Sequence, residues 1–97
     1  MVVLVNRHTG SGGEIFLLAA RQIPDLTVMG TRTAGLPGMI TAYDLPQKGW
    51  QITMTSSRTT GMDGKSYLRV GLEPDKLVYD DASDTIDQIL ESAMKEF

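Results

Sequence analysis

The first thirty residues read as a strand, a glycine-rich turn, a helix and a second strand, and this order restricts the folds open to the chain. Residues 2–5 (V-V-L-V) are apolar and mostly β-branched, as in a strand buried on both faces. The glycine-rich segment 6–13 follows, and then a predicted helix at 14–22, which ends before Pro24. Residues 26–29 (L-T-V-M) predict another buried strand. A βαβ unit places its two strands parallel, so the sequence predicts an α/β fold.

The middle of the chain predicts an antiparallel β-hairpin. Residues 39–45 read as one strand and residues 46–49 (P-Q-K-G) as the turn. Residues 50–56 alternate large apolar and polar side chains, which is the period of a half-buried strand. We expect the apolar residues of this second strand to form a packed face: Trp50, Ile52 and Met54.

The last third predicts a turn at 60–64 with Asp-Gly at its tip, a short edge strand at 76–79 and a C-terminal helix. Asp81 or Ser83 is expected to cap this helix. Asp84 and Asp87 in its first turns and Lys95 in its last turn suit the helix dipole. Its apolar residues fall at helical spacing: Ile86, Ile89, Leu90, Ala93, Met94 and Phe97.

A strand of the fully buried type at the start of a 97-residue chain needs neighbours and a covering layer from elsewhere. Chains of this length form one domain at most. We therefore expect the chain to be the back part of something larger, and its apolar first strand to promote self-association. Five scattered methionines are expected to fill gaps in the core: Met29, Met39, Met54, Met62 and Met94.

The composition argues against several classes of function. The chain has 9 Lys and Arg against 12 Asp and Glu, a net charge of −3, without a basic run, which disfavours a nucleic-acid partner. Without cysteine and with one histidine, His8, it offers little for a metal or cofactor, and we expect neither. Residues 1–5 lack the charged start of a signal peptide, and no apolar run is long enough to span a bilayer. An exported and a cytoplasmic location both stay open.

The glycine-rich turn carries the residue most open to a chemical role, Ser11. A sharp strand-to-helix turn presents a serine hydroxyl to solvent, and the amides of Gly12 and Gly13 at the helix start can stabilise an oxyanion. The spacing T-x-S-x-G resembles a nucleophile elbow with Thr9 in place of its first glycine. Such turns also bind anions or serve only as turns, although the third glycine of the dinucleotide fingerprint and the Walker lysine are absent. Spacing alone leaves these alternatives open.

Four ordered segments resemble the S41 serine peptidases, which include the C-terminal processing proteases, the tricorn core and the retinoid-binding-protein relatives. The first two are V-L-V-N followed by T-G-S-G-G-E-I over residues 3–15, and G-T-R-T-A-G at 30–35. The others are D-G at 63–64 and G-L-E-P-D at 71–75. The resemblance implies that residues 1–97 form the C-terminal portion of an S41 peptidase domain with a crotonase/ClpP-like layered fold.

By position, the resemblance makes Ser11 the nucleophile, the Gly12 amide an oxyanion donor and Glu14 a positioning residue at the site rim. Two departures bear on the general base. Leu36 stands where the processing-protease branch has its lysine, and the arrangement T-A-G-L-P-G looks more like the tricorn branch. That branch takes a histidine from an upstream segment and a glutamate near Leu68 or Arg69, and neither of these two positions is acidic.

His8 lies three residues before Ser11, where a side chain usually points elsewhere across the turn, so we expect it at the site rim rather than as the base. The resulting hypothesis is a serine peptidase that hydrolyses peptides or proteins through an acyl-enzyme on Ser11, completed by a missing N-terminal half or a partner subunit, and we expect the isolated chain to be inactive. The alternatives are a non-catalytic module that binds a peptide or a hydrophobic ligand, and a chain without activity of its own that persists as a homo-oligomer.

Overall fold

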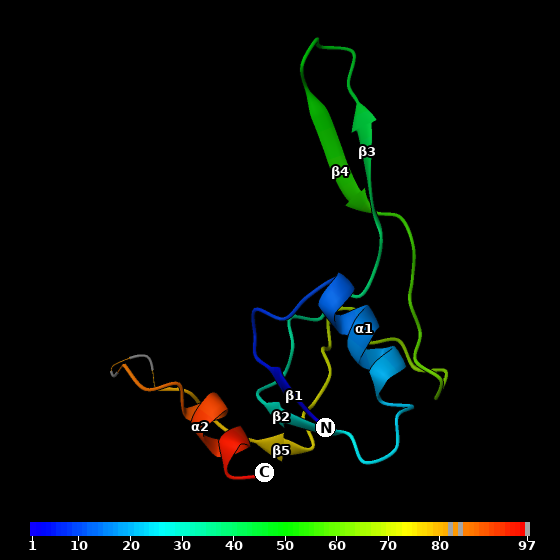
Figure 1. The fold of residues 1–97 in the computed structure, drawn as a ribbon. Coiled ribbons are helices and arrows are strands. Elements are labelled where there is room, and N and C mark those ends of the chain that lie inside the picture. The colour runs from blue at the N-terminus through cyan, green and yellow to red at the C-terminus, as the bar shows by residue number, and fades with distance from the viewer. Residues whose placement is uncertain (82, 84, 97) are drawn as a thin grey trace.

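The residues that the structure describes form a three-stranded parallel sheet with two helices, and a two-stranded hairpin extends away from this body (Figure 1). The computed structural model describes residues 1–81, 83 and 85–96. The predicted mixed α/β class is confirmed. The elements in chain order are β1 (Val2–Val5), α1 (Gly12–Ala20), β2 (Thr27–Gly30), β3 (Ile40–Asp44), β4 (Gln51–Thr55), β5 (Lys76–Leu77) and α2 (Gln88–Met94).

The sheet has the order β1-β2-β5, and both pairs of strands are parallel. The register of β1 on β2 runs from Val2 opposite Thr27 to Val5 opposite Gly30. The predicted βαβ unit and the short edge strand are thereby confirmed. Gly30 has a φ of +132°, and a Cβ built on it would overlap the Val5 carbonyl oxygen, so the chain leaves β2 at a point that only glycine fits.

The core lies between the sheet and α1. Leu17 and Leu18 of α1 pack with Val5, Val28 and Leu72, and these side chains are at most 9% exposed. The expectation that the first strand is buried on both faces is wrong for this chain. Among the described residues β1 forms one edge of the sheet, and its Leu4, which points to one face of the sheet, is 39% exposed.

The hairpin has the predicted antiparallel pairing, but the prediction that it packs is wrong. Trp50, Ile52 and Met54 are 66%, 45% and 49% exposed. Among the described residues, β3 and β4 contact each other and no other helix or strand. The period-2 pattern places these three side chains on one face of the strand, and among the described residues no layer covers that face.

The C-terminal helix is shorter than its apolar pattern predicts. It begins after Asp87, whose side chain accepts a hydrogen bond from the Leu90 amide, rather than after Asp81 or Ser83. Asp81 instead accepts bonds from the amide and the hydroxyl of Ser83 in a local turn. Ile89 and Ala93 are buried against the sheet side, whereas Ile86, Leu90 and Met94 are exposed. Asp84 and Phe97 lie outside the described residues.

The prediction that methionines fill the core holds for one of the five. Met29 of β2 is 2% exposed, because it occupies the central strand. The other four are from 49% to 82% exposed, namely Met39, Met54, Met62 and Met94. None of the helices in the described part of the chain is long and apolar enough to cross a membrane.

Replacement of Gly30 by alanine should strongly destabilise the fold. The new Cβ would overlap the Val5 carbonyl, and alanine disfavours a φ of +132°. We expect Gly30→Ala to lower the free energy of unfolding by more than about 3 kcal/mol in urea denaturation. Gly12→Ala is the matched control, because no atom lies within 4 Å of its added Cβ, and it should change that free energy by less than about 0.5 kcal/mol. Equal effects would contradict the close approach.

Candidate active site

Ser11 occupies a strained corner between β1 and α1. The Gly13 amide donates to the Gly10 carbonyl oxygen over 2.9 Å, which closes a four-residue turn with Ser11 at its first central position. Ser11 has φ 48° and ψ −116°, the geometry of a type II′ turn, in which glycine dominates at this position. Its side chain is exposed. The turn therefore presents the serine to solvent in a conformation that costs about 1–3 kcal/mol.

The amides at the start of α1 are not equally available. The Gly13 amide is used by the turn, and the amides of Glu14 and Ile15 both donate to the Ser11 carbonyl oxygen. Within residues 1–81, 83 and 85–96, no hydrogen bond from the Gly12 amide is found. Of the two amides that the sequence offers as oxyanion donors, Gly12 is thus the one left free.

The Glu14 side chain is completely buried and accepts four hydrogen bonds. Its Oε2 accepts from the amides of Ser11 at 3.1 Å and Leu36 at 2.7 Å. Its Oε1 accepts from the Gly35 amide at 2.7 Å and the Thr33 hydroxyl at 2.5 Å. Four donors match the lone-pair capacity of a carboxylate. Glu14 therefore lies beneath the turn, below the rim where the sequence placed it, and holds the Ser11 amide in position.

Thr33 extends this network to the segment before β5. Its hydroxyl donates to Glu14 and accepts from the Leu72 amide at 2.8 Å, and its own amide donates to the Leu72 carbonyl at 3.1 Å. Thr33 is 5% exposed. Thr33 was not among the site residues expected from the sequence, although its position after the second strand, in the T-A-G segment at 33–35, was the available signal.

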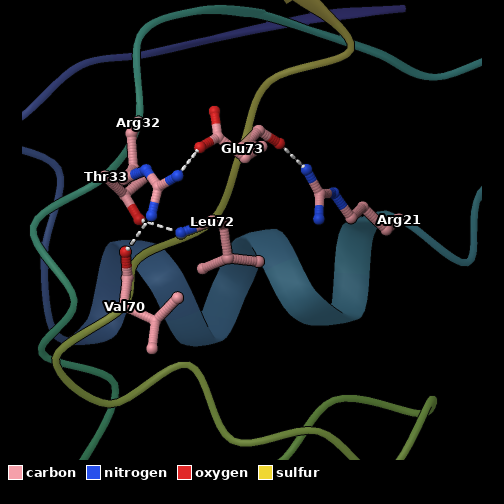
Figure 2. A network of polar contacts seen from close by, with 6 residues as sticks. All are labelled: Arg21, Arg32, Thr33, Val70, Leu72 and Glu73. Atoms are coloured by element: carbon pink, nitrogen blue, oxygen red, sulfur yellow. Dashed lines mark hydrogen bonds and ion pairs between the residues drawn. The ribbon is translucent and has the colours of Figure 1, made fainter.

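Two arginines fix the segment 70–73 from outside. Figure 2 shows the Arg32 guanidinium between Glu73, with which it forms an ion pair, and the Val70 carbonyl, 3.0 Å away. Arg21, just after α1, donates to the Glu73 carbonyl oxygen. The loop after β2 and the end of α1 are thereby both tied to this segment.

His8 is exposed and forms hydrogen bonds with residues other than Ser11. Its Nε2 accepts from the Arg7 side chain at 3.2 Å, and its amide donates to the Asn6 side chain. It lines a groove of about 850 Å³ beyond the carboxyl ends of β1, β2 and β5, together with residues such as Arg32 and Tyr79. Ser11 does not line this groove. Among the described residues, the hydrogen bonds of His8 go to Arg7 and Asn6, and none joins it to Ser11.

Position 36, where the resemblance leads us to expect a lysine base, and positions 68–69, where it leads us to expect a glutamate, hold other residues. The Leu36 side chain is 57% exposed, while its amide serves Glu14. Asp63, five residues before position 68, accepts a hydrogen bond from the Tyr67 hydroxyl. This bond lowers the pKa of Asp63, to which the hydrogen bond from the Lys65 amide also contributes, and it raises the pKa of the Tyr67 hydroxyl. The described residues contain no cluster of histidine and acidic side chains suited to a metal ion.

The profile of peptidase family S41 matches residues 1–78. A crystal structure described as a peptidase from Parabacteroides merdae is 31% identical with a TM-score of 0.81, over 98% of this chain. The photosystem II D1 C-terminal processing protease is 28% identical with a TM-score of 0.67, over 97% of this chain. The tricorn protease is 22% identical with a TM-score of 0.78, over 98% of this chain, and this likeness concerns the fold.

The chain spans only part of these proteins: 30% of the Parabacteroides merdae chain, 23% of the D1 processing protease and 10% of the tricorn protease. No curated protein sequence matches it. The similarity covers nearly all of this chain, including the turn with Ser11 and the loops that bind Glu14.

Replacement of Glu14 by glutamine should destabilise the site and the fold. The amide NH₂ would face two donors in place of an acceptor, which leaves buried amides without partners. We expect Glu14→Gln to lower the free energy of unfolding by about 2–4 kcal/mol in denaturant titrations. Glu91→Gln on the exposed side of α2 is the control and should be nearly neutral. A neutral Glu14→Gln would refute the role given to the carboxylate.

Replacement of Ser11 by glycine should stabilise the chain. Glycine adopts φ 48° and ψ −116° without strain, whereas alanine retains the Cβ that causes it. We expect Ser11→Gly to raise the free energy of unfolding by about 1 kcal/mol relative to Ser11→Ala, measured by thermal unfolding. A lower stability of the glycine variant would show that the turn is not strained.

Proposed function

This chain belongs to peptidase family S41, and we propose that it carries the nucleophile, Ser11, of a serine peptidase site whose remaining groups come from outside residues 1–97. The observation that carries the proposal is the corner at Ser11. An exposed hydroxyl in a strained strand-to-helix turn stands beside a free helix-start amide, that of Gly12. This is the arrangement that acyl transfer to serine requires.

The reaction follows from these two groups and a base. The Ser11 oxygen attacks the carbonyl carbon of a peptide bond while a general base takes its proton, and the Gly12 amide donates to the oxyanion that forms. The protonated base then gives this proton to the leaving amine, and the acyl group stays on Ser11 as an ester. Water, deprotonated by the same base, hydrolyses the ester and restores the serine.

Glu14 is assigned a positioning role in this mechanism. It accepts from the Ser11 amide and is sealed beneath the turn, so it does not reach a substrate. By holding this amide and the loop at 33–36 together, it fixes the direction of the Ser11 side chain and of the Gly12 amide. Such fixed geometry is what makes an oxyanion donor effective.

The base and a second oxyanion donor are assigned to a preceding half of the domain or to a partner subunit. The surface of the chain supports this division. α1 is apolar nearly all round, with Phe16 58% and Ile15 37% exposed, and β1 is a sheet edge with Leu4 exposed. A covering layer and a further strand would complete a crotonase/ClpP-like domain, of which residues 1–97 are the C-terminal portion.

The substrate class that we propose is a peptide or protein. It rests on family membership and on the protease neighbours, of which one is a C-terminal processing protease. One observation favours a second candidate, a non-catalytic module that binds a peptide or hydrophobic ligand. The groove of about 850 Å³ includes His8 but not Ser11. In that case Ser11→Ala would leave ligand binding unchanged.

A fluorophosphonate probe tests the proposal through intact-mass analysis. Because the proposed base lies outside residues 1–97, we expect labelling of the isolated chain to be slow and confined to one adduct per chain at Ser11, absent in Ser11→Ala and retained in Ser83→Ala, which alters an exposed serine far along the chain. Without a local base, the labelling rate should rise about tenfold per pH unit from about pH 7 to about pH 9, as the hydroxyl ionises.

A rate that levels off above about pH 7 would instead indicate a histidine base, and His8→Ala would then abolish the plateau. We expect His8→Ala to leave the rate and its pH profile unchanged. Adducts that persist in Ser11→Ala would show that another residue is the nucleophile and would contradict the proposal.

A further inference from the structure

The hairpin of β3 and β4 has one apolar and one mainly polar face. Its register pairs Tyr43 with Ile52 and Thr41 with Met54, and the Leu45 amide extends the ladder to the Trp50 carbonyl oxygen. Directly opposed residues share a face, and successive residues alternate between faces. We call the apolar set the hairpin face: Tyr43, Leu45, Trp50, Ile52 and Met54.

The hairpin face has no covering layer in the described part of the chain. Its five side chains are from 37% to 66% exposed, and the hairpin stands clear of the sheet and both helices (Figure 1). A two-stranded hairpin alone is at best marginally stable in water, and a contiguous exposed apolar patch usually marks an interface. The face therefore requires a partner.

The chain exposes more surface than a compact monomer of its mass and length. The accessible area is 7011 Å², against about 5,500 Å² for a compact monomer of this mass. The radius of gyration is 16.4 Å, against about 12.5 Å for a compact chain of this length. This excess of about 1,500 Å² per chain is shared by α1, the β1 edge and the hairpin, so the hairpin face supplies part of the area that a stable homodimer buries.

We propose that the hairpin face binds the same face of a second copy of this chain, in a two-fold dimer with the two hairpins stacked as a small sandwich. Residues 39–57 contain one acid, Asp44, and one base, Lys48, so two hairpins meet without the repulsion expected from a net charge of −3. Asp44 lies on the opposite face, where it accepts a hydrogen bond from Gln51, so no carboxylate is desolvated. Two such sheets pack about 10 Å apart.

Neighbouring residues of β4 provide a matched pair of variants for measuring the mass by light scattering. The wild-type chain is expected at twice 10.6 kDa. Ile52→Lys, on the hairpin face, should give the 10.6 kDa monomer, whereas Thr53→Lys, on the opposite face, should remain a dimer. A wild-type chain that stays monomeric at about 100 µM, or equal dissociation by both variants, overturns the proposal.

Trp50, the single tryptophan, gives a readout that needs no substitution. Because it is 66% exposed in one chain, its emission should shift to shorter wavelength and its quenching by acrylamide should fall as the concentration rises through the dimer transition. Circular dichroism of Ile52→Lys checks that the parallel sheet and helices persist. Protection of Trp50 that is independent of concentration, in a chain that stays monomeric, would assign the face to another segment and overturn the dimer. These readouts are independent of Ser11, so their failure leaves the proposed peptidase role untouched.

Discussion

The buried carboxylate of Glu14 is the interaction on which the rest of the structure depends. Its desolvation is offset only when all four donors are in place, and these come from the glycine turn and the loop after β2. Through Thr33 the same network reaches Leu72, which closes the core beneath α1. Because a half-formed network is worse than none, these segments are expected to become ordered together.

Local patterns predicted the elements that local forces determine. The βαβ order, the glycine turn before α1, the hairpin and the edge strand at β5 all follow from turn residues and apolar periodicity. The four-residue capping relation between Ser11 and Glu14 is local as well, and the sequence placed both residues in the turn. What the sequence could not give is which apolar faces are covered, since Trp50 and Met54 look the same whether or not a layer lies on them.

The long-range contacts of the site could not be predicted from the sequence pattern either. Thr33 bonds to Glu14, 19 positions away in the sequence, and to Leu72, 39 positions away. No periodicity in the sequence around these residues indicates that the bonds form. Likewise, Asp81 and Ser83 read as caps of α2, but their mutual hydrogen bonds compete with helix initiation and move it to Asp87. In both cases sequence spacing does not indicate which of the available partners a polar side chain will bond.

The strained backbone at Ser11 also bears on how such a chain can change over generations. Folding alone would prefer glycine at this corner, and serine and glycine codons can differ by a single base. Without selection for a chemical role, mutation at this position would therefore favour glycine, which lowers the conformational energy of the turn and removes the hydroxyl. A serine at this corner carries a conformational cost that the fold alone does not offset, and the nucleophilic role proposed for its hydroxyl would account for that cost.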